Sequence, residues 1–277
     1  MYKRLLSVQD ISCIGQCSLT VALPIISACG IECAILPSAV LSTHTGGFTG
    51  FTFRDLTDDI PSIKNHWIKE GLSFDTIYTG YLGSTRQIDY VKDIFAETGK
   101  DNCLKIVDPA MADDGKLYYG FDDEFVKAMA TLCAEADYVL PNITEACFMT
   151  GAEYKTEYDR AYVDDILNRL TSIGCKNIIL TGISYQDGKT GVVVCENGTY
   201  SYYEHDKVSQ GCHGTGDIYA SAFTGAMTRG FGAFEAAKIA ADFTLECIKY
   251  TQTLDNHTYG AAFEPVLGKL IGMLSKS

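Results

Sequence analysis

The sequence predicts an α/β protein with a mostly parallel sheet covered by helices on both faces. Patterns typical of short buried strands alternate with helical patterns almost throughout the chain. The chain has 277 residues, of which 47% are hydrophobic and 21% charged, so it can bury a sizeable core. Because no repeat, low-complexity segment or linker divides it, we expect a single domain over residues 1–277.

The expected elements follow in order. Strands are predicted at residues 4–8, 32–37, 76–79, 104–107, 138–140 and 177–181, and a hairpin at 189–195 and 199–203. Helices are predicted at residues 19–29, 57–70, 84–97, 122–134, 143–150, 162–170, 215–229, 233–251 and 263–274. The Thr- and Gly-rich residues 42–54 have no sustained period and suggest a flap or two short lid strands.

Composition limits the function classes. A net charge of −13 argues against wide contact with nucleic acid or an anionic membrane, although a local anion pocket with Mg²⁺ still allows ATP binding. No stretch approaches the length of a membrane span, and the apolar run at the N-terminus is too short for a signal peptide. The 11 scattered cysteines favour free thiols in a reducing compartment, so we expect a cytoplasmic protein.

A glycine loop, Gly211-Cys212-His213-Gly214-Thr215-Gly216-Asp217, is the centre of the functional interpretation. Its glycines let the backbone turn tightly, and the first turn of the following helix offers free N–H groups to an anion such as phosphate. Asp217 would then take a proton from a hydroxyl while the loop holds the phosphoryl group being transferred. The alternative is that Asp217 merely caps a helix after a glycine turn.

Polar residues follow the ends of five predicted strands: Asp10, Tyr81, Asp108, Asn142 and Thr181. In open α/β sheets the ligand crevice lies beyond the carboxyl ends of the strands. We therefore expect these residues to gather along one edge, although each alone also suits a turn former or a helix cap.

Asn142 and Glu145 lie three residues apart at a predicted helix start. Both can project towards the crevice, where Mg²⁺ would take oxygen ligands beside substrate phosphates. The same spacing also satisfies a capping box, so both interpretations stay open.

Two further groups are candidates for ligand contact. Asp108, Asp113 and Asp114 offer three carboxylates after a strand, suited either to a metal or phosphate tail or to a solvated turn. His44 and His213 stand beside Gly- and Thr-rich loops, where a structural or solvated role is the alternative.

Together these segments resemble the ribokinase-like superfamily and, within it, the pyridoxal kinases. Gly214-Thr215-Gly216-Asp217 is similar to the superfamily's anion hole and catalytic aspartate, and Asn142 with Glu145 matches its N-x-x-E motif. The vitamin B6 branch is suggested by three segments: Ser42-Thr43-His44-Thr45-Gly46, Thr79-Gly80-Tyr81, and Asp108-Pro109 with Asp113.

The resemblance implies a ribokinase-like fold, usually dimeric, with small lid segments. It implies ATP-dependent phosphorylation of the 5′-hydroxymethyl group of pyridoxal, pyridoxine or pyridoxamine, with Mg²⁺; whether K⁺ activates is open. Asp217 would be the base, and the amides of residues 214–216 would hold the γ-phosphoryl group. A lid function for residues 43–50 is a hypothesis.

The remaining roles are implied in the same way. Contact with ATP is implied for Asp113, Asn142, Glu145 and Thr181, and contact with the metal for Asp108 and Glu145. Contact with the pyridine substrate is implied for Asp10, Thr45 and Tyr81, with Ser12, His44 and His213 as further candidates. Many relatives have Ser where this chain has Asp10, so either Asp10 or Ser12 could meet the ring.

Two rival functions stay open. A hydroxymethylpyrimidine kinase of thiamine synthesis has a similar aromatic substrate, but that branch often has Cys where this chain has Asp217. A non-catalytic nucleotide- or vitamer-binding protein could use the same loop, although a pure anion binder gains nothing from the Asp217 carboxylate.

Overall fold

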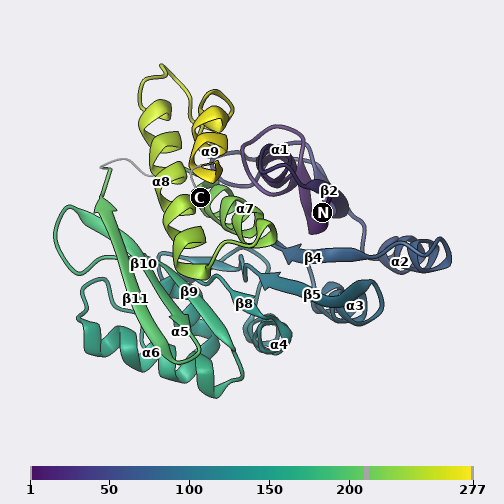
Figure 1. Cartoon of the computed structure of the whole chain (residues 1–277), viewed down its shortest axis with the longest axis horizontal. Helices are drawn as coiled ribbons and strands as arrows, with labels where there is room; N and C mark the ends of the chain where they lie inside the picture. The colour runs from purple at the N-terminus through teal and green to yellow at the C-terminus, as the bar shows by residue number, and fades with distance from the viewer. Residues whose placement is uncertain (1, 209–211, 276–277) are drawn as a thin grey trace.

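The structure is a computed structural model that describes residues 2–208 and 212–275 (Figure 1). Gly211, the first glycine of the predicted loop, lies outside the described residues. The strands have the following bounds: β1 Arg4–Ser12, β2 Glu32–Leu41, β3 Phe53–Asp55, β4 Phe74–Thr79, β5 Gly99–Val107, β6 Ala112–Asp113, β7 Lys116–Leu117, β8 Tyr138–Val139, β9 Asn177–Ile183, β10 Lys189–Glu196 and β11 Thr199–Asp206.

Within the described residues, nine strands form one sheet in the order β11-β10-β9-β8-β5-β4-β1-β2-β3, and β6 pairs with β7 apart from it. The strands from β9 to β2 in this order pair in parallel. β3, β10 and β11 pair antiparallel to their neighbours at the two ends of the sheet. The predicted α/β class with a mostly parallel sheet is therefore confirmed.

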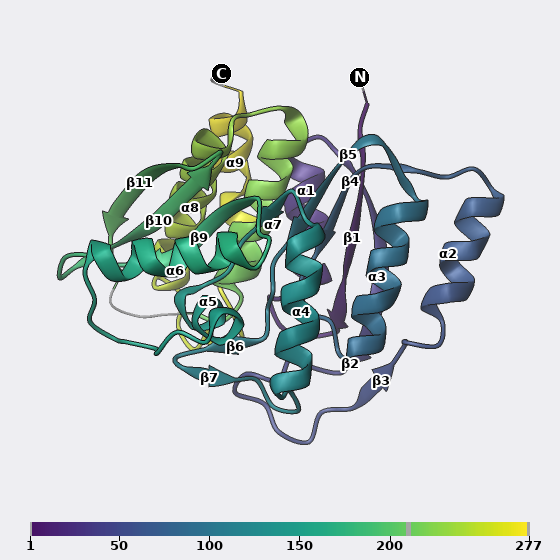
Figure 2. The same ribbon diagram turned by 90° about the horizontal axis from the view of Figure 1, so that it is seen from below.

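Helices cover both faces of the sheet (Figure 2). One face carries α1 Leu19–Ala28, α7 Thr215–Arg229, α8 Ala233–Thr251 and α9 Leu267–Leu274, the last preceded by the 3₁₀ turn Glu264–Val266. The other face carries α2 Ile60–Lys69, α3 Thr85–Glu97, α4 Asp123–Glu135, α5 Ile143–Thr150 and α6 Arg160–Ser172. Each face buries its own apolar core, as expected for parallel strands covered on both sides.

Every predicted strand and helix is present, with ends that differ by a few residues. The hairpin of β10 and β11 turns at Asn197 and Gly198, whose φ angles of 52° and 75° match the twist that a two-residue hairpin needs. In the described part of the chain, no helix has the length and apolar character that crossing a bilayer requires.

Two local predictions were wrong. Asp10 lies inside β1 and not after its end, because β1 continues past an irregularity and pairs Ile11 and Ser12 with β2. Polar residues at buried positions made this part of the strand look like a loop. The loop expected after Asp108 contains the β6–β7 hairpin, whose two-residue strands are too short to give a period.

The packing of β10 against β11 allows a stability prediction at Gly191. A Cβ at Gly191 would lie 2.0 Å from the carbonyl oxygen of Tyr203 in β11, and backbone cannot rotate away. We expect Gly191→Ala to lower the free energy of unfolding by about 1–3 kcal/mol, measured by urea denaturation. Gly272→Ala in α9 is the control, because a Cβ there meets nothing within 4 Å. Equal midpoints for the two variants would contradict this account.

Candidate active site

The five polar residues expected at one sheet edge do gather there. Read along the sheet, Thr181 belongs to β9, Asn142 follows β8, Asp108 follows β5, Tyr81 follows β4 and Asp10 belongs to β1. These strands are consecutive neighbours, and short contacts extend the pairing beyond their ends: the Asp108 amide donates to the Thr79 carbonyl (2.9 Å). In the sheet, β2 lies on one side of β1 and β4 lies on the other. The strand order therefore reverses at β1, and such a reversal opens a crevice at the carboxyl ends of the strands.

The glycine loop meets this edge at the start of α7. Gly214 is the N-cap residue, with φ at 76°, and its Cα lies so close to the segment after β1 that a Cβ would be 1.7 Å from the Gln16 carbonyl oxygen. Only glycine fits this position. Thr215, Gly216 and Asp217 then form the first turn of α7, whose leading N–H groups have no partners inside the helix.

Asp217 lies among other acids. Burial raises its pKa to about 8, with further contributions from the carboxylates of Asp108 and Asp10, while a hydrogen bond with the backbone of Ser18 opposes the rise. Ser18 has the left-handed φ of 52°, which strains a non-glycine residue and directs its backbone to Asp217. A carboxylate held in this way is a stronger base than an ordinary aspartate.

Glu145 supports the loop that carries Asp108. Its two carboxylate oxygens accept hydrogen bonds from the amides of Met111 (3.0 Å) and Asn142 (2.9 Å), and Asn142 Oδ1 accepts from the Glu145 amide (2.9 Å). The capping box is therefore present. Because Glu145 also reaches the Asp108 loop, its capping role and a role in arranging the acidic edge are compatible.

The acidic side chains fit a divalent cation together with phosphates. Burial raises the pKa of Asp108 to about 7, and burial together with Asp108 raises that of Glu145 well above its usual range. Among residues 2–208 and 212–275, no three His, Cys, Asp or Glu side chains form a metal cage by themselves. Mg²⁺ needs no such cage, since it is commonly held by one or two carboxylates, waters and substrate phosphates.

Asp113 and Asp114 stand on the β6–β7 hairpin. Asp113 is exposed in β6, burial of part of its side chain raises its pKa, and its Oδ1 accepts a hydrogen bond from the Asp114 amide (2.9 Å). Asp114 and Gly115 have positive φ angles and form the turn, and the Gly115 amide donates to Thr144 Oγ1 (3.1 Å). The hairpin is thus anchored to α5.

Tyr118, which sequence reasoning missed, also faces the acids. Burial raises the pKa of its phenol, followed by the charges of Glu145, Asp113, Asp108 and Asp217. The phenol is therefore a neutral donor beside the acidic edge. Tyr118 is 43% exposed and Tyr119 next to it is fully exposed, and no spacing rule distinguishes them, because the β6–β7 hairpin that orients Tyr118 was not predicted.

Asp10 and Ser12 meet at the end of β1. Ser12 Oγ donates to Asp10 Oδ2 (3.1 Å), and both residues are buried. Burial raises the pKa of Asp10, and the Ser12 and Ser18 hydroxyls oppose this. Burial, then Asp10, raises the pKa of Tyr81 to about 12, so these two side chains face one another. The sequence left Asp10 and Ser12 as alternatives for contact with the ring. Because their side chains contact one another, both lie at the same point of the sheet edge.

The segment after β2 contacts the glycine loop through two imidazoles. The rings of His44 and His213 lie 5.6 Å apart, and Phe48 stands edge-on to His44 at 5.1 Å. The Gly46 amide donates to His44 Nδ1 (3.1 Å), which places the proton of a neutral ring on Nε2. Burial and His213 lower the His44 pKa. Thr45 is exposed on this segment.

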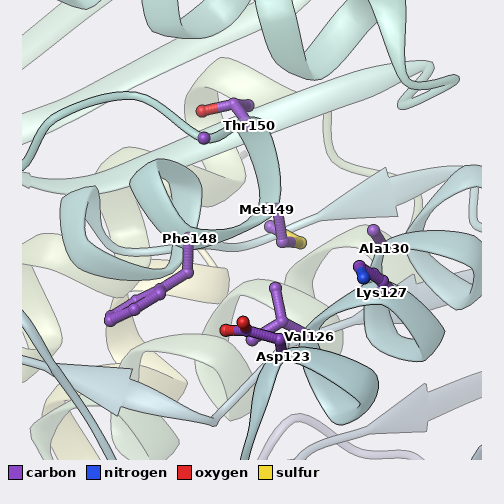
Figure 3. Close-up of a pocket in the computed structure, with 8 residues that line it drawn as sticks. Asp123, Val126, Lys127, Ala130, Phe148, Met149 and Thr150 are labelled. Atoms are coloured by element: carbon purple, nitrogen blue, oxygen red, sulfur yellow. The ribbon is translucent and has the colours of Figure 1, made fainter.

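One surface cavity, of about 420 Å³, lies elsewhere (Figure 3). Its lining comes from α4 and α5 and includes Asp123, Lys127, Phe148 and Met149. None of the candidate site residues lines it. We therefore locate the site by the convergence of charged and glycine residues at the sheet edge.

Comparisons with known proteins show what the whole chain is similar to. A family model described as phosphomethylpyrimidine kinase matches residues 23–263. Pyridoxal kinase of Dictyostelium discoideum is 24% identical over 243 residues, which are 81% of this chain and 78% of that protein.

Two solved structures share the fold at higher identity. Pyridoxal kinase from Lactobacillus plantarum superposes with a TM-score of 0.91 at 29% identity, covering 99% of this chain and 98% of that one. A Bacteroides thetaiotaomicron protein, provisionally described as a phosphomethylpyrimidine kinase and crystallised with pyridoxal, has a TM-score of 0.90 at 34% identity, covering 99% and 96%.

Two glycines of the loop should respond differently to substitution. Gly214→Ala places a Cβ against the Gln16 backbone at a left-handed φ, so we expect it to lower the free energy of unfolding by about 1–3 kcal/mol. At Gly216, the second residue of α7, a Cβ meets nothing within 4 Å, so Gly216→Ala should leave the ligand-free protein at least as stable as the parent. Thermal unfolding of both variants checks this, and a destabilised Gly216→Ala would refute the loop geometry.

Proposed function

Because the chain belongs to the phosphomethylpyrimidine kinase family, we propose that it is an ATP-dependent kinase of the hydroxymethyl group of pyridoxal, pyridoxine and pyridoxamine. The observation that carries this proposal is the position of Asp217. It stands in the first turn of α7, directly after the Gly214–Gly216 turn, and faces the acids at the carboxyl edge of the sheet. A base beside an anion-binding turn suits phosphoryl transfer to a hydroxyl.

In the proposed reaction, the free amides of residues 214–216 hold the γ-phosphoryl group of ATP. Asp217 accepts the proton of the hydroxymethyl group. At the same time the hydroxymethyl oxygen bonds to the γ-phosphorus, and the bond between that phosphorus and the ADP oxygen breaks. The products are the phosphate ester, ADP and a protonated Asp217, which afterwards releases its proton to solvent.

ATP would bind at the half of the sheet edge that follows β5, β8 and β9. Bound Mg²⁺ would neutralise charge on the triphosphate, and Asp108 would hold it directly or through water. Glu145 would act by fixing the Asp108 loop through its contact with the Met111 amide. Asn142, which follows β8, forms a parallel β-bridge with Thr181 of β9. These two residues would line the nucleotide, with Asp113 near its phosphates.

The substrate side is the other half. Asp10, Ser12 and Tyr81 would meet the aromatic ring, and Asp10 favours a ring that presents a proton donor. His44 and His213 would close this side, with Thr45 on the same segment. Support for a B6 vitamer comes from the two pyridoxal kinases and the pyridoxal-containing structure among the similar proteins.

Phosphorylation of hydroxymethylpyrimidine is a second candidate. The description of the matching family model favours it, and this substrate is also an aromatic ring with a hydroxymethyl group. A binding protein without turnover is less well supported, because Asp217 would place a negative charge beside the bound anion. The single domain, the homodimer and the cytoplasmic location expected from the sequence belong to the same proposal.

Asp217→Asn separates catalysis from folding. We expect kcat to fall about 10²–10⁴-fold, since the general base is lost, while the KM for ATP stays near that of the parent. An ordinary aspartate has a pKa near 3.9, whereas burial raises that of folded Asp217 to about 8. The folded parent therefore loses stability as pH rises from about 3.9 to about 8, because the buried Asp217 must lose its proton. The asparagine side chain carries no charge at any pH, so the Asp217→Asn variant should melt at a higher temperature than the parent near pH 8.

The control for this variant is Asp89→Asn, which changes an exposed acid on α3 that is not among the candidate site residues. It should match the parent in both kcat and melting temperature. An Asp217→Asn enzyme with unchanged kcat would refute the proposed base.

A substrate panel tests the reaction itself. Purified protein with Mg²⁺ and ATP is given pyridoxal, pyridoxine, pyridoxamine or hydroxymethylpyrimidine, and ADP and the phosphate ester are measured. We expect ester from the B6 vitamers, none after chelation of the metal, and little from Asp217→Asn. Ester from the pyrimidine alone would assign the protein to thiamine synthesis. Binding of a vitamer without formation of any ester would support the alternative of a binding protein without turnover.

A further inference from the structure

The ring of Tyr81 belongs to a row of three aromatic side chains. The ring centroids of Tyr81 and Phe121 lie 5.5 Å apart with the planes tilted by 32°. Phe121 in turn stacks on Phe125, with centroids 3.8 Å apart and an angle of 6° between the planes. Contacts of this kind between aromatic rings add to the stabilisation that burial of their surface provides. We call Tyr81, Phe121 and Phe125 the aromatic row.

The aromatic row joins two loops of the sheet edge. Tyr81 follows β4, whereas Phe121 directly precedes Asp122, the N-cap residue of α4, and Phe125 lies in the first turn of that helix. Phe125 is buried, and Tyr81 and Phe121 are half-buried. The aromatic row therefore runs from the core beneath α4 to the place where Tyr81 faces Asp10.

The start of α4 explains only one contact of the row. A hydrophobic residue before the N-cap often packs on the first turns of its helix and fixes the direction in which the chain enters. Phe121 packs on Phe125 in this way, while Asp122 Oδ1 accepts a hydrogen bond from the Phe125 amide (3.0 Å). An aliphatic side chain at the position of Phe121 would serve the helix equally well. The contact between Phe121 and Tyr81, which lies on another loop, has no part in starting α4.

The backbone around Tyr81 is held independently of the aromatic row. Ser38 Oγ donates to the Tyr81 carbonyl (3.2 Å). The Gly83 amide donates to Gln87 Oε1 (2.7 Å), and the side chains of Ser38 and Gln87 belong to fully buried residues. Loss of the Phe121 ring should therefore free the Tyr81 side chain to change its orientation while the loop after β4 stays in place.

An oriented aromatic side chain suits a flat ring as its ligand. Aromatic rings attract one another in defined geometries, so the angle of the Tyr81 ring decides how well a substrate ring packs on it. A sugar ring instead presents hydroxyls, which need polar partners when they are buried. The pyridine and pyrimidine substrates considered for this chain are flat rings.

We propose that Phe121 is a positioning residue that holds the Tyr81 side chain in the orientation in which it packs on the aromatic ring of the substrate. Phe121 acts through Tyr81 and does not itself touch the substrate. The inference rests on the proposed kinase function, because the contact between Tyr81 and the ring is part of that proposal. It adds a residue from the start of α4 to the substrate side of the site.

The test removes the Phe121 ring and keeps an apolar side chain, as in Phe121→Leu. We expect the Kd of pyridoxal, titrated without nucleotide, and the KM of pyridoxal both to rise about three- to tenfold, because one aromatic contact is weakened. The KM of ATP and kcat should stay within about twofold of the parent values, since the ring is held alike before and during phosphoryl transfer. Phe121→Tyr keeps the ring and should bind pyridoxal as the parent does.

A double-mutant cycle tests whether Phe121 acts through Tyr81. Tyr81→Leu should weaken the binding of pyridoxal, and addition of Phe121→Leu should then have no further effect. If Phe121→Leu does not fold, Phe121→Met takes its place in every measurement, because methionine adapts to irregular space in an apolar core.

Phe148→Leu is the matched control. Phe148 and Phe121 are both partly buried and pack on the same apolar core, but Phe148 lines the surface cavity between α4 and α5. Its replacement removes a phenyl ring from the same core and should leave both the Kd and the KM of pyridoxal unchanged.

The outcomes separate this inference from the proposed function. A parent that phosphorylates neither a vitamer nor hydroxymethylpyrimidine overturns both, and a parent that accepts only the pyrimidine is titrated with that ring. An active parent whose Phe121→Leu variant binds the ring within twofold of the parent overturns this inference alone. Phe121→Tyr as weak as Phe121→Leu, additive effects in the cycle, or a fall in kcat without weaker binding would each overturn it too, and would assign Phe121 to the packing of α4.

Discussion

The structure depends on holding Asp217 beside other acids at the carboxyl edge of one sheet. Burial raises the pKa of Asp217 to about 8 and that of Asp108 to about 7, so neither is easily charged in the free protein. The groups that oppose this are dipoles of the chain itself: the Ser18 backbone at Asp217 and the Ala110 amide at Asp108 (3.2 Å). A cation bound beside such carboxyls favours their charged forms.

The rest of the fold brings these dipoles to the acids. The segment between β1 and α1 contacts the glycine loop through the close approach of Gln16 to Gly214, and Gln16 also bridges to Gly260. Gln16 Nε2 donates to both oxygens of Glu264 (3.0 and 2.9 Å), and the Ala261 amide donates to the His213 carbonyl (3.0 Å). Three parts of the chain that are distant in sequence thereby fix the turn at His213 and Gly214.

The sequence was sufficient for the alternation of strands and helices and for the sheet edge, because periodicity and strand ends are local signals. It failed where burial overrides local polarity: Gln9 and Asp10 look like a loop but continue β1. It also missed Tyr118, which the fold brings beside acids that lie far along the chain. The spacing of Asn142 and Glu145 could not show that a capping box and a link to Met111 coexist, since only the fold brings that amide to the carboxylate.

The central claim is that Asp217 faces the hydroxyl that receives the phosphoryl group. A crystal structure with a non-hydrolysable ATP analogue and pyridoxal would test it most directly. The account predicts the Asp217 carboxylate within about 3.2 Å of the 5′-hydroxyl oxygen, with the terminal phosphate on the amides of residues 214–216. A hydroxymethyl group that points away from Asp217, or a triphosphate bound outside the glycine loop, would contradict it.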